Sequence, residues 1–156
     1  MMLRHRQIIQ LRIGGRYCYR YIRHRSNDVL MEWKYGDITS RIIAAAMEVH
    51  RELGCGFPEH VYGRALTIEF PRHKLNAIPE FQMPIFYKQI RIAYRRVDFF
   101  VEDIIPTEIK AVTQVDNGDL AQALNYLEAY NLEVGLLINF GAPSLQVKRL
   151  LNKKYK

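Results

Sequence analysis

The stretch RVDFFVEDIIPTEIKAV, residues 96–112, holds an aspartate, Asp98, and then a glutamate and a lysine two residues apart, Glu108 and Lys110, in apolar surroundings. Asp98 lies in a run rich in Val and Phe, which is typical of a β-strand, and Glu108 and Lys110 lie in a second such run. An ionised group is costly in the core of a sheet unless it is paired or binds a metal. These three residues therefore form either a metal site or a set of mutually neutralising charges.

The spacing predicts that the three side chains face one another. Because side chains alternate along a strand, Glu108 and Lys110 point to the same face. A hairpin that turns around Glu102 and Asp103 would set Asp98 opposite the start of the next strand, within reach of Glu108. Two carboxylates make an oxygen site that suits Mg²⁺ or Mn²⁺, with waters and a substrate phosphate completing the shell. Lys110 could orient or deprotonate a water, or stabilise charge on a phosphoryl group.

A purely structural explanation stays open from these residues alone. A Glu-x-Lys pair at the end of a strand is common on exposed faces, and one Asp ten residues earlier adds little. The apolar flanks VDFFV and IKAV, however, indicate a half-buried face. A charged side chain without a partner or a function is unfavourable on a half-buried face. The apolar flanks therefore favour a functional site.

Hydrophobic periodicity predicts the elements that must position this site. After Met31 we expect one α/β domain, residues 31–156, with the order ααβββαβα. The helices are expected within 37–54, 54–70, 117–131 and 144–156, and the strands within 81–101 (two strands joined near Lys88 and Gln89), 104–112 and 133–140. The three consecutive strands are expected to be antiparallel.

Prolines modify this prediction in three places. Pro58 suits a first helical position, which puts Glu59 in the first turn of the second helix. Pro71 predicts that this helix ends early. Pro106 removes a backbone donor two residues before Glu108, so the third strand is expected to start late or to lie at an edge of the sheet.

The net charge of +7 lies entirely at the N-terminus. Residues 1–27 hold seven arginines and no acid, and 16 basic and 16 acidic residues follow, so the body is neutral. We expect residues 1–30 to be a basic, disordered extension, or sequence upstream of a true start at Met31. A basic arm that binds phosphates and an organelle transit peptide are the alternatives.

Composition narrows the class of protein further. Cys18 and Cys55 have neither the spacing of a zinc site nor the number for a disulfide scaffold, which favours a reducing, cytoplasmic setting. No stretch approaches the roughly 20 apolar residues of a membrane span. We expect a soluble protein without a membrane partner.

The candidate residues carry a resemblance to a known family. Asp98, Glu108 and Lys110, with Gln122 on a later helix and Glu59 on an earlier one, resemble the PD-(D/E)xK nuclease superfamily. More specifically, GFPEHVY is similar to the G-x-x-E-x-V-Y signature of the GxxExxY protein family, and EIKAV, AQALNYL and VGLLINFGAPSLQVKR resemble its later blocks. The resemblance covers about residues 35–152.

The resemblance implies a restriction-endonuclease-like core, a central mixed β-sheet flanked by helices. It implies Asp98 and Glu108 as ligands of Mg²⁺ or Mn²⁺, Lys110 as the catalytic lysine, Gln122 as a positioning residue and Glu59 as an additional acid. Glu59 could instead complement a helix N-terminus, and Gln122 could be an ordinary surface residue.

Three function classes remain at this stage. The first is a metal-dependent nuclease, the second a nuclease-like domain that binds nucleic acid or a protein without turnover, and the third a structural module. DNA is favoured over RNA as a partner, and a homodimer is left open. The neutral body predicts weak non-specific DNA affinity unless basic residues gather on one side, as Lys88, Arg91, Arg95 and Arg96 could. Tyr62 is expected to pack in the core with a satisfied hydroxyl, and His50 and His60 to be structural or exposed.

Overall fold

The computed structural model describes residues 7–13, 16–22 and 34–156. The chain divides into two contact units, Met1–Gly36 and Asp37–Lys156. In the first unit, β1 (Gln7–Ile13) and β2 (Arg16–Ile22) form an antiparallel pair. Of residues 1–30, the described ranges include only 7–13 and 16–22, and the predicted disorder of this extension stays a prediction.

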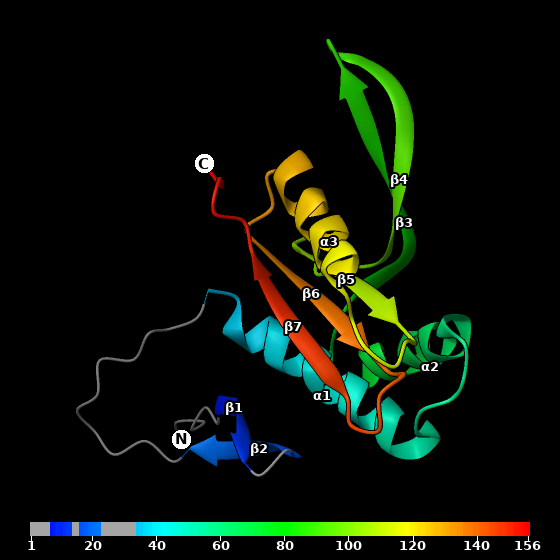
Figure 1. Cartoon of the computed structure of the whole chain (residues 1–156). Coiled ribbons are helices and arrows are strands. Elements are labelled where there is room, and N and C mark those ends of the chain that lie inside the picture. Colours follow the sequence, from blue (N-terminus) through cyan, green and yellow to red (C-terminus); the bar gives the residue numbers. More distant parts are fainter. Residues whose placement is uncertain (1–6, 14–15, 23–33) are drawn as a thin grey trace, which may run out of the picture. The chain divides into compact units, whose positions relative to one another are not determined.

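A five-stranded mixed sheet forms the centre of the second unit (Figure 1). Its strands, in spatial order, are β3 (Ala77–Tyr87), β4 (Ile90–Val101), β5 (Ile105–Lys110), β6 (Val134–Asn139) and β7 (Gln146–Leu151). Only β5 and β6 run parallel; every other neighbouring pair is antiparallel. The predicted α/β class and the antiparallel β3, β4 and β5 are confirmed.

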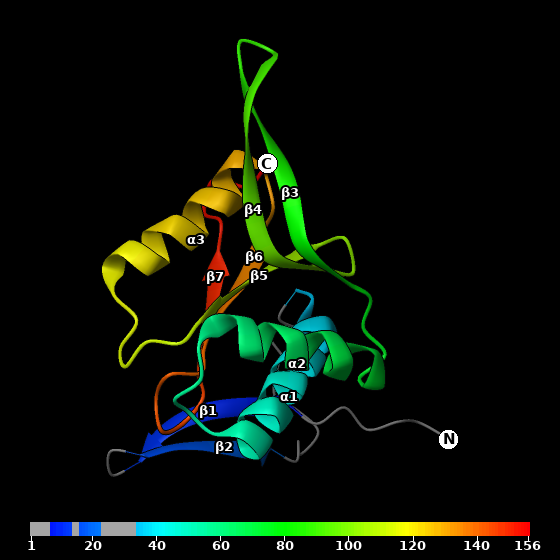
Figure 2. The same cartoon turned by 90° about the vertical axis from the view of Figure 1, so that its right-hand side faces the viewer.

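Helices pack on both faces of this sheet (Figure 2). They are α1 (Gly36–Leu53), α2 (Glu59–Arg72) and α3 (Asn117–Ala129). Leu127 of α3 packs with Leu137 of β6 on one face. On the other face, the ring of Phe70 in α2 meets Phe99 of β4 edge-on at 5.0 Å. No helix in the described ranges is long and apolar enough to cross a membrane.

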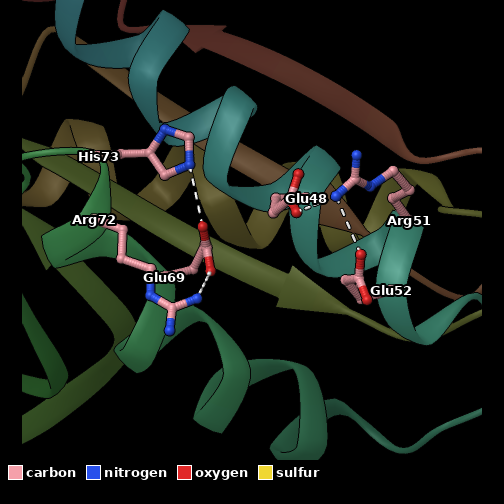
Figure 3. Close-up of polar contacts among 6 residues, drawn as sticks. All are labelled: Glu48, Arg51, Glu52, Glu69, Arg72 and His73. Carbon is pink, nitrogen blue, oxygen red and sulfur yellow. Dashed lines mark hydrogen bonds and ion pairs between the residues drawn. The ribbon is translucent and has the colours of Figure 1, made fainter.

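Ion pairs join neighbouring residues on α1 and α2 (Figure 3). Their members are Glu48, Arg51 and Glu52 on α1, and Glu69, Arg72 and His73 at the end of α2. The exposed pairs among them contribute at most about 1 kcal/mol each. The helices therefore depend mainly on their buried faces, which on α1 comprise Thr39, Ile42, Ala45, Ala46 and Val49.

Two tight turns set the register of the antiparallel strands. Lys88 and Gln89 join β3 to β4 with φ angles of 46° and 65°, and Glu102 and Asp103 join β4 to β5 with φ angles of 52° and 55°. Two successive residues with positive φ characterise the hairpin turn whose twist matches that of the flanking strands. Both turns lie where the sequence predicts them.

The position of β5 corrects the prediction drawn from Pro106. β5 lies in the middle of the sheet and begins at Ile105, rather than at an edge or late in the run. The N–H of Ile109 points towards β4, so by alternation the nitrogen of Pro106 points towards β6. Pairing between β5 and β6 begins only at Thr107 and Leu136. The missing donor therefore falls just outside that ladder, and a central strand tolerates it.

The C-terminal segment differs from its prediction as well. Residues 144–156 were expected to form a helix, whereas Gln146–Leu151 form β7 and pair antiparallel with β6. Val147 and Leu150 have a spacing that fits a helix, so the local pattern is ambiguous. Pairing with β6 decides between the two structures because it satisfies the backbone groups of a fully buried strand.

Pro71 was expected to end α2 early, but the helix continues through it to Arg72. Phe70 is almost fully buried against Phe99 at this point. Its backbone carbonyl also accepts hydrogen bonds from the N–H groups of His73 and Leu75. Packing and capping of this last turn outweigh the local cost of proline.

The loops after β5 and β6 meet closely beside the end of the sheet. The buried amide of Asn139 accepts from the N–H of Val112 at 3.0 Å and donates to the carbonyl of Val112 at 2.8 Å. A Cβ placed on Gly141 would lie 2.4 Å from both the N and O atoms of Val112. Only glycine allows this approach, which holds the segment that follows Lys110.

We expect Gly141→Ala to destabilise the protein by a few kcal/mol, because backbone must shift to admit the new carbon. Gly63→Ala in α2 is the matched control, since a Cβ there meets no atom within 4 Å. Alanine in a helix interior should leave stability unchanged or raise it by up to about 1 kcal/mol. Urea unfolding of both variants measures the difference, and equal stabilities would contradict the close approach.

Candidate active site

β4 and β5 part at a point where a side chain replaces backbone pairing. Their ladder runs from Val101 and Ile105 to Phe99 and Thr107, where it stops. One residue further along β4, the carboxylate of Asp98 accepts the N–H of Ile109 at 2.8 Å. Asp98 therefore satisfies a backbone donor of the central strand and is held beside β5.

Glu108 is placed next to Asp98 by this arrangement and is 9% exposed. Burial raises the pKa of Glu108 to about 8, and the negative charge of Asp98 and a side-chain hydrogen bond with it act in the same direction. Its Oε1 atom has no hydrogen-bond partner in the described part of the chain. A buried carboxyl oxygen without a partner is costly and is suited to accept a ligand.

Lys110 lies on the same face, two residues along β5, and is held by α3. Its Nζ lies 3.2 Å from Oδ1 of Asp119, and both side chains are 20% exposed. Burial alone would lower the pKa of Lys110, but the hydrogen bond and charge of Asp119 and the charges of Glu59 and Glu108 outweigh it and raise the pKa. Lys110 is therefore a cation at neutral pH.

The start of α3 explains why Asp119 is available to Lys110. Asp116 caps the helix by accepting the N–H of Asp119 at 2.8 Å, and Oδ2 of Asp119 accepts the N–H of Asp116 at 3.2 Å. This reciprocal capping box fixes the first turn of the helix. The remaining oxygen of Asp119 is thereby directed to the lysine.

Further along α3, Tyr126 closes the site from the helix side. Its hydroxyl donates to the carbonyl of Arg96 on β4 at 2.6 Å. Burial raises the pKa of Tyr126, and the charge of Glu108 adds to the shift, while Arg95 and Gln122 act against it. Tyr126 is therefore near both the buried glutamate and the exposed Gln122.

Glu59 approaches the same site from α2. It is exposed and lies in the first turn of that helix, as predicted, although Pro58 is the N-cap and not the first helical residue. Its negative charge interacts with Lys110 and helps to raise the pKa of the ammonium group. The helix-terminus and site interpretations are thus both compatible with its position.

The structure places the five predicted residues around the point where β4 parts from β5. Asp98, Glu108 and Lys110 interact directly or through shared neighbours, Gln122 is linked through Tyr126, and Glu59 through Lys110. Sequence reasoning missed Asp119 and Tyr126. Both lie three or four residues from Gln122 along α3, so a helical-face argument starting from Gln122 could have found them.

The structural expectations for Tyr62 and two histidines are also met. Tyr62 is fully buried, stacks on Phe140 at 4.5 Å and donates its hydroxyl to the carbonyl of Gly54 at 2.8 Å. His50 Nε2 lies 3.1 Å from the carbonyl of Ala142, and His60 is exposed. Tyr62 and His50 therefore support the fold.

A family model described as the PD-(D/E)XK nuclease superfamily matches residues 36–150. The match spans well over half of the chain, and the protein therefore belongs to this superfamily. No curated protein and no solved structure gives a significant match. The resemblance drawn from the sequence is confirmed at the level of the superfamily, whose members are typically metal-dependent.

The residues present fit a divalent cation. Asp98 and Glu108 supply oxygen donors, and the buried Glu108 Oε1 lacks a hydrogen-bond partner among the described residues. No group of three or more His, Cys, Asp or Glu residues suited to a metal occurs in the described part of the chain. Mg²⁺ is commonly held by one or two carboxylates, with waters and substrate phosphates as the other ligands. A two-carboxylate site meets that requirement.

The raised pKa of Glu108 has a consequence for stability without metal. Between pH 4.5 and about 8 the folded protein retains a proton that the unfolded chain has lost, so ionisation increasingly opposes folding as the pH rises. We expect Glu108→Gln to become more stable relative to wild type over this range, by a few kcal/mol at pH 8.

Urea unfolding in EDTA at pH 5, 6, 7 and 8 measures this difference. Glu52→Gln, at an exposed position of α1, serves as the control and should show a flat difference from wild type. A flat difference for Glu108→Gln as well would show that Glu108 ionises in the folded protein at its ordinary pKa.

Proposed function

We propose that this protein is a nuclease that hydrolyses phosphodiester bonds of nucleic acid with the help of a divalent metal. The single observation that carries the proposal is the pair Asp98 and Glu108, one carboxyl group tied to the backbone of β5 and the other buried with an oxygen that lacks a partner among the described residues. Membership of the PD-(D/E)XK superfamily supports it. We assign the activity to one domain, residues 31–156.

Asp98 and Glu108 are the proposed ligands of Mg²⁺ or Mn²⁺. Such a cation supplies positive charge to the scissile phosphate and lowers the pKa of a water that it binds. Asp98 is preorganised for this task because its other oxygen is occupied by the Ile109 N–H. Glu108 must lose its proton on binding, since its pKa is about 8 without metal.

Lys110 is proposed to stabilise negative charge on the phosphoryl group. Its raised pKa keeps Nζ protonated at neutral pH, so its N–H groups donate hydrogen bonds and do not remove a proton. Donors placed where charge develops typically account for factors of about 10² to 10³ in rate. Of the two roles considered for Lys110, charge stabilisation is therefore favoured over general base.

Asp119, Glu59 and Gln122 complete the proposed machinery at its border. Asp119 restricts Lys110 through their 3.2 Å ion pair. Glu59 reinforces the positive charge of Lys110. Gln122 is exposed, one turn of α3 before Tyr126, and offers an amide that can position substrate.

We also assign the chain to the GxxExxY family within this superfamily. Gly56, Glu59, Val61 and Tyr62 match its signature. The signature has a structural basis here, since Gly56 has a φ of 111° and the Tyr62 hydroxyl holds the same turn through Gly54. That turn sets the start of α2 and thus the position of Glu59.

We expect Asp98→Asn to abolish binding of Mn²⁺ while leaving the fold intact. The asparagine oxygen can still accept the Ile109 N–H, and loss of the negative charge removes one cause of the raised pKa of Glu108. Asp103→Asn, at an exposed turn position with positive φ that asparagine tolerates, is the matched control. Calorimetric titration with Mn²⁺, beside urea melts without metal, separates the outcomes: unchanged Mn²⁺ affinity in Asp98→Asn contradicts the metal site.

We expect Lys110→Ala to reduce cleavage by about 100-fold or more and to retain binding of Mn²⁺. Lys153→Ala, at an exposed position of the C-terminal segment, removes the same charge and should cleave as wild type does. The assay offers single-stranded and double-stranded substrates with Mg²⁺ or Mn²⁺. Wild type that binds these substrates and never cleaves them would favour the alternative, a nuclease-like domain without turnover.

A further inference from the structure

The two longest strands extend beyond the rest of the sheet. β4 pairs with β5 only from Phe99 onwards, so its residues from Ile90 to Val97, apart from the bulged Ile92, are paired on one side alone, with β3. Figures 1 and 2 both show this part of β3 and β4 as a two-stranded ribbon that projects past α3 and the other strands. We call residues 81–97 the ribbon.

The ribbon is strongly basic although the body of the chain is neutral. It holds Lys88, Arg91, Arg95 and Arg96 and no acidic residue. Arg96 pairs with Glu80, just outside the ribbon, at 3.3 Å. Within the described ranges, the other three cations form no ion pair. Their charge is therefore available to an anionic partner.

Aromatic rings hold these cations in place. The Lys88 ammonium lies 5.5 Å from the ring centre of Tyr87, and the Arg91 guanidinium 4.8 Å from that of Tyr94. Residues 91 and 94 would point to opposite faces of a regular strand. A register shift between Ile85 and Phe86, which leaves Ile92 unpaired, brings them together. The bulge thus creates a combined cationic and aromatic surface.

The apolar side chains of the ribbon are exposed as well. They are Phe86, Tyr87, Ile90, Ile92 and Tyr94, and each is more than half exposed. A surface with this much exposed apolar area normally has a partner. A second copy of the ribbon would bring like charges together, which is unfavourable. A polyanion that also offers apolar contacts, as nucleic acid bases do, matches both properties.

The base of the ribbon leads directly into the proposed active site. The Arg95 guanidinium lies 4.1 Å from the ring centre of Tyr126, whose neighbour is Glu108. Asp98 follows on the same strand. From Asp98 to Ile90 the strand rises about 26 Å, the length of roughly seven or eight base pairs.

We propose that the ribbon enters the major groove of duplex DNA and holds the duplex across the Asp98 and Glu108 site. The major groove of B-DNA, about 12 Å wide, admits a two-stranded ribbon, whereas that of A-form RNA is too narrow for side chains to read. Lys88 and Arg91 contact phosphates at the groove edges, and the apolar side chains face the base edges. This inference rests on the proposed nuclease function and specifies its substrate as duplex DNA.

The test measures binding with cleavage switched off. In the Lys110→Ala background and in EDTA, fluorescence anisotropy gives the Kd of a labelled 24-base-pair DNA duplex, the corresponding single strand and the same duplex as RNA, at 50 to 200 mM NaCl. Lys88→Asn/Arg91→Gln removes two ribbon charges, and asparagine suits the positive φ of residue 88. Arg64→Gln/Lys153→Gln removes two exposed charges elsewhere and is the matched control.

We expect duplex DNA to bind most tightly and the ribbon variant to raise its Kd by at least tenfold near 0.1 M salt. The slope of log Kd against log salt should fall by about 2, the value for two lost phosphate contacts. The control should change the Kd less than threefold. Circular dichroism and thermal melts of each variant confirm that the fold is retained.

Several results would overturn the inference. One is a ribbon variant that binds duplex DNA as the control does; others are tighter binding of the single strand, or equal binding of duplex RNA. A wild-type dimer that Lys88→Asn/Arg91→Gln dissociates with no change in DNA affinity would also overturn it and make the ribbon a self-association surface. Failure of the proposed activity is distinguishable: ribbon-dependent DNA binding without cleavage in Mn²⁺ overturns hydrolysis and supports the ribbon.

Discussion

The hydrogen bond from the Ile109 N–H to the Asp98 carboxylate is the interaction on which the site depends. A buried backbone donor in a central strand must find an acceptor, and at this position a side chain of β4 supplies it instead of a backbone carbonyl of β4. Because the Asp98 side chain reaches further than a backbone carbonyl, the backbones of β4 and β5 can diverge at this position. The same contact therefore places one carboxylate beside Glu108 and releases the strand that continues into the ribbon.

Burial of Glu108 beside Asp98 determines the protonation state of the pair. A carboxyl group that keeps its proton up to a pH of about 8 is a poor contributor to stability in the metal-free protein, since ionisation opposes folding. In the proposed metal site, a cation that replaced the proton would remove this cost. The destabilising placement of the acid and the affinity expected of the site thus have the same physical origin, which is desolvation beside a second carboxylate.

Charge is distributed unevenly in a chain whose body is neutral overall. Asp119 serves both the start of α3 and Lys110, so one carboxylate ties the helix to the sheet and keeps the lysine charged. In the ribbon, in contrast, most of the cations lie against aromatic rings and form no ion pair within the described residues. A net charge summed over the chain conceals this separation, and the local field near the site is the relevant quantity.

The sequence alone was sufficient for those features that depend on local periodicity and turn chemistry. Alternation along β5 placed Glu108 and Lys110 on one face, and the turns at residues 88–89 and 102–103 were recognisable between their strands. These features are local because side-chain direction and φ preference follow from a few neighbouring residues. The effects of Pro71 and Pro106 and the last element were misjudged, since they depend on partners far away in the chain.

Tertiary structure alone decided how those local elements meet. The segment containing Val147 and Leu150 fits either a helix or a strand, and only the unsatisfied edge of β6 makes it β7. Pro106 is tolerated in a central strand because pairing with β6 starts one residue later. Asp119 and Tyr126 join the site only through the packing of α3 on the sheet. Spacing along the chain specifies which way a side chain points, whereas burial and pairing partners are set by contacts between distant segments, and these determine its pKa and its chemistry.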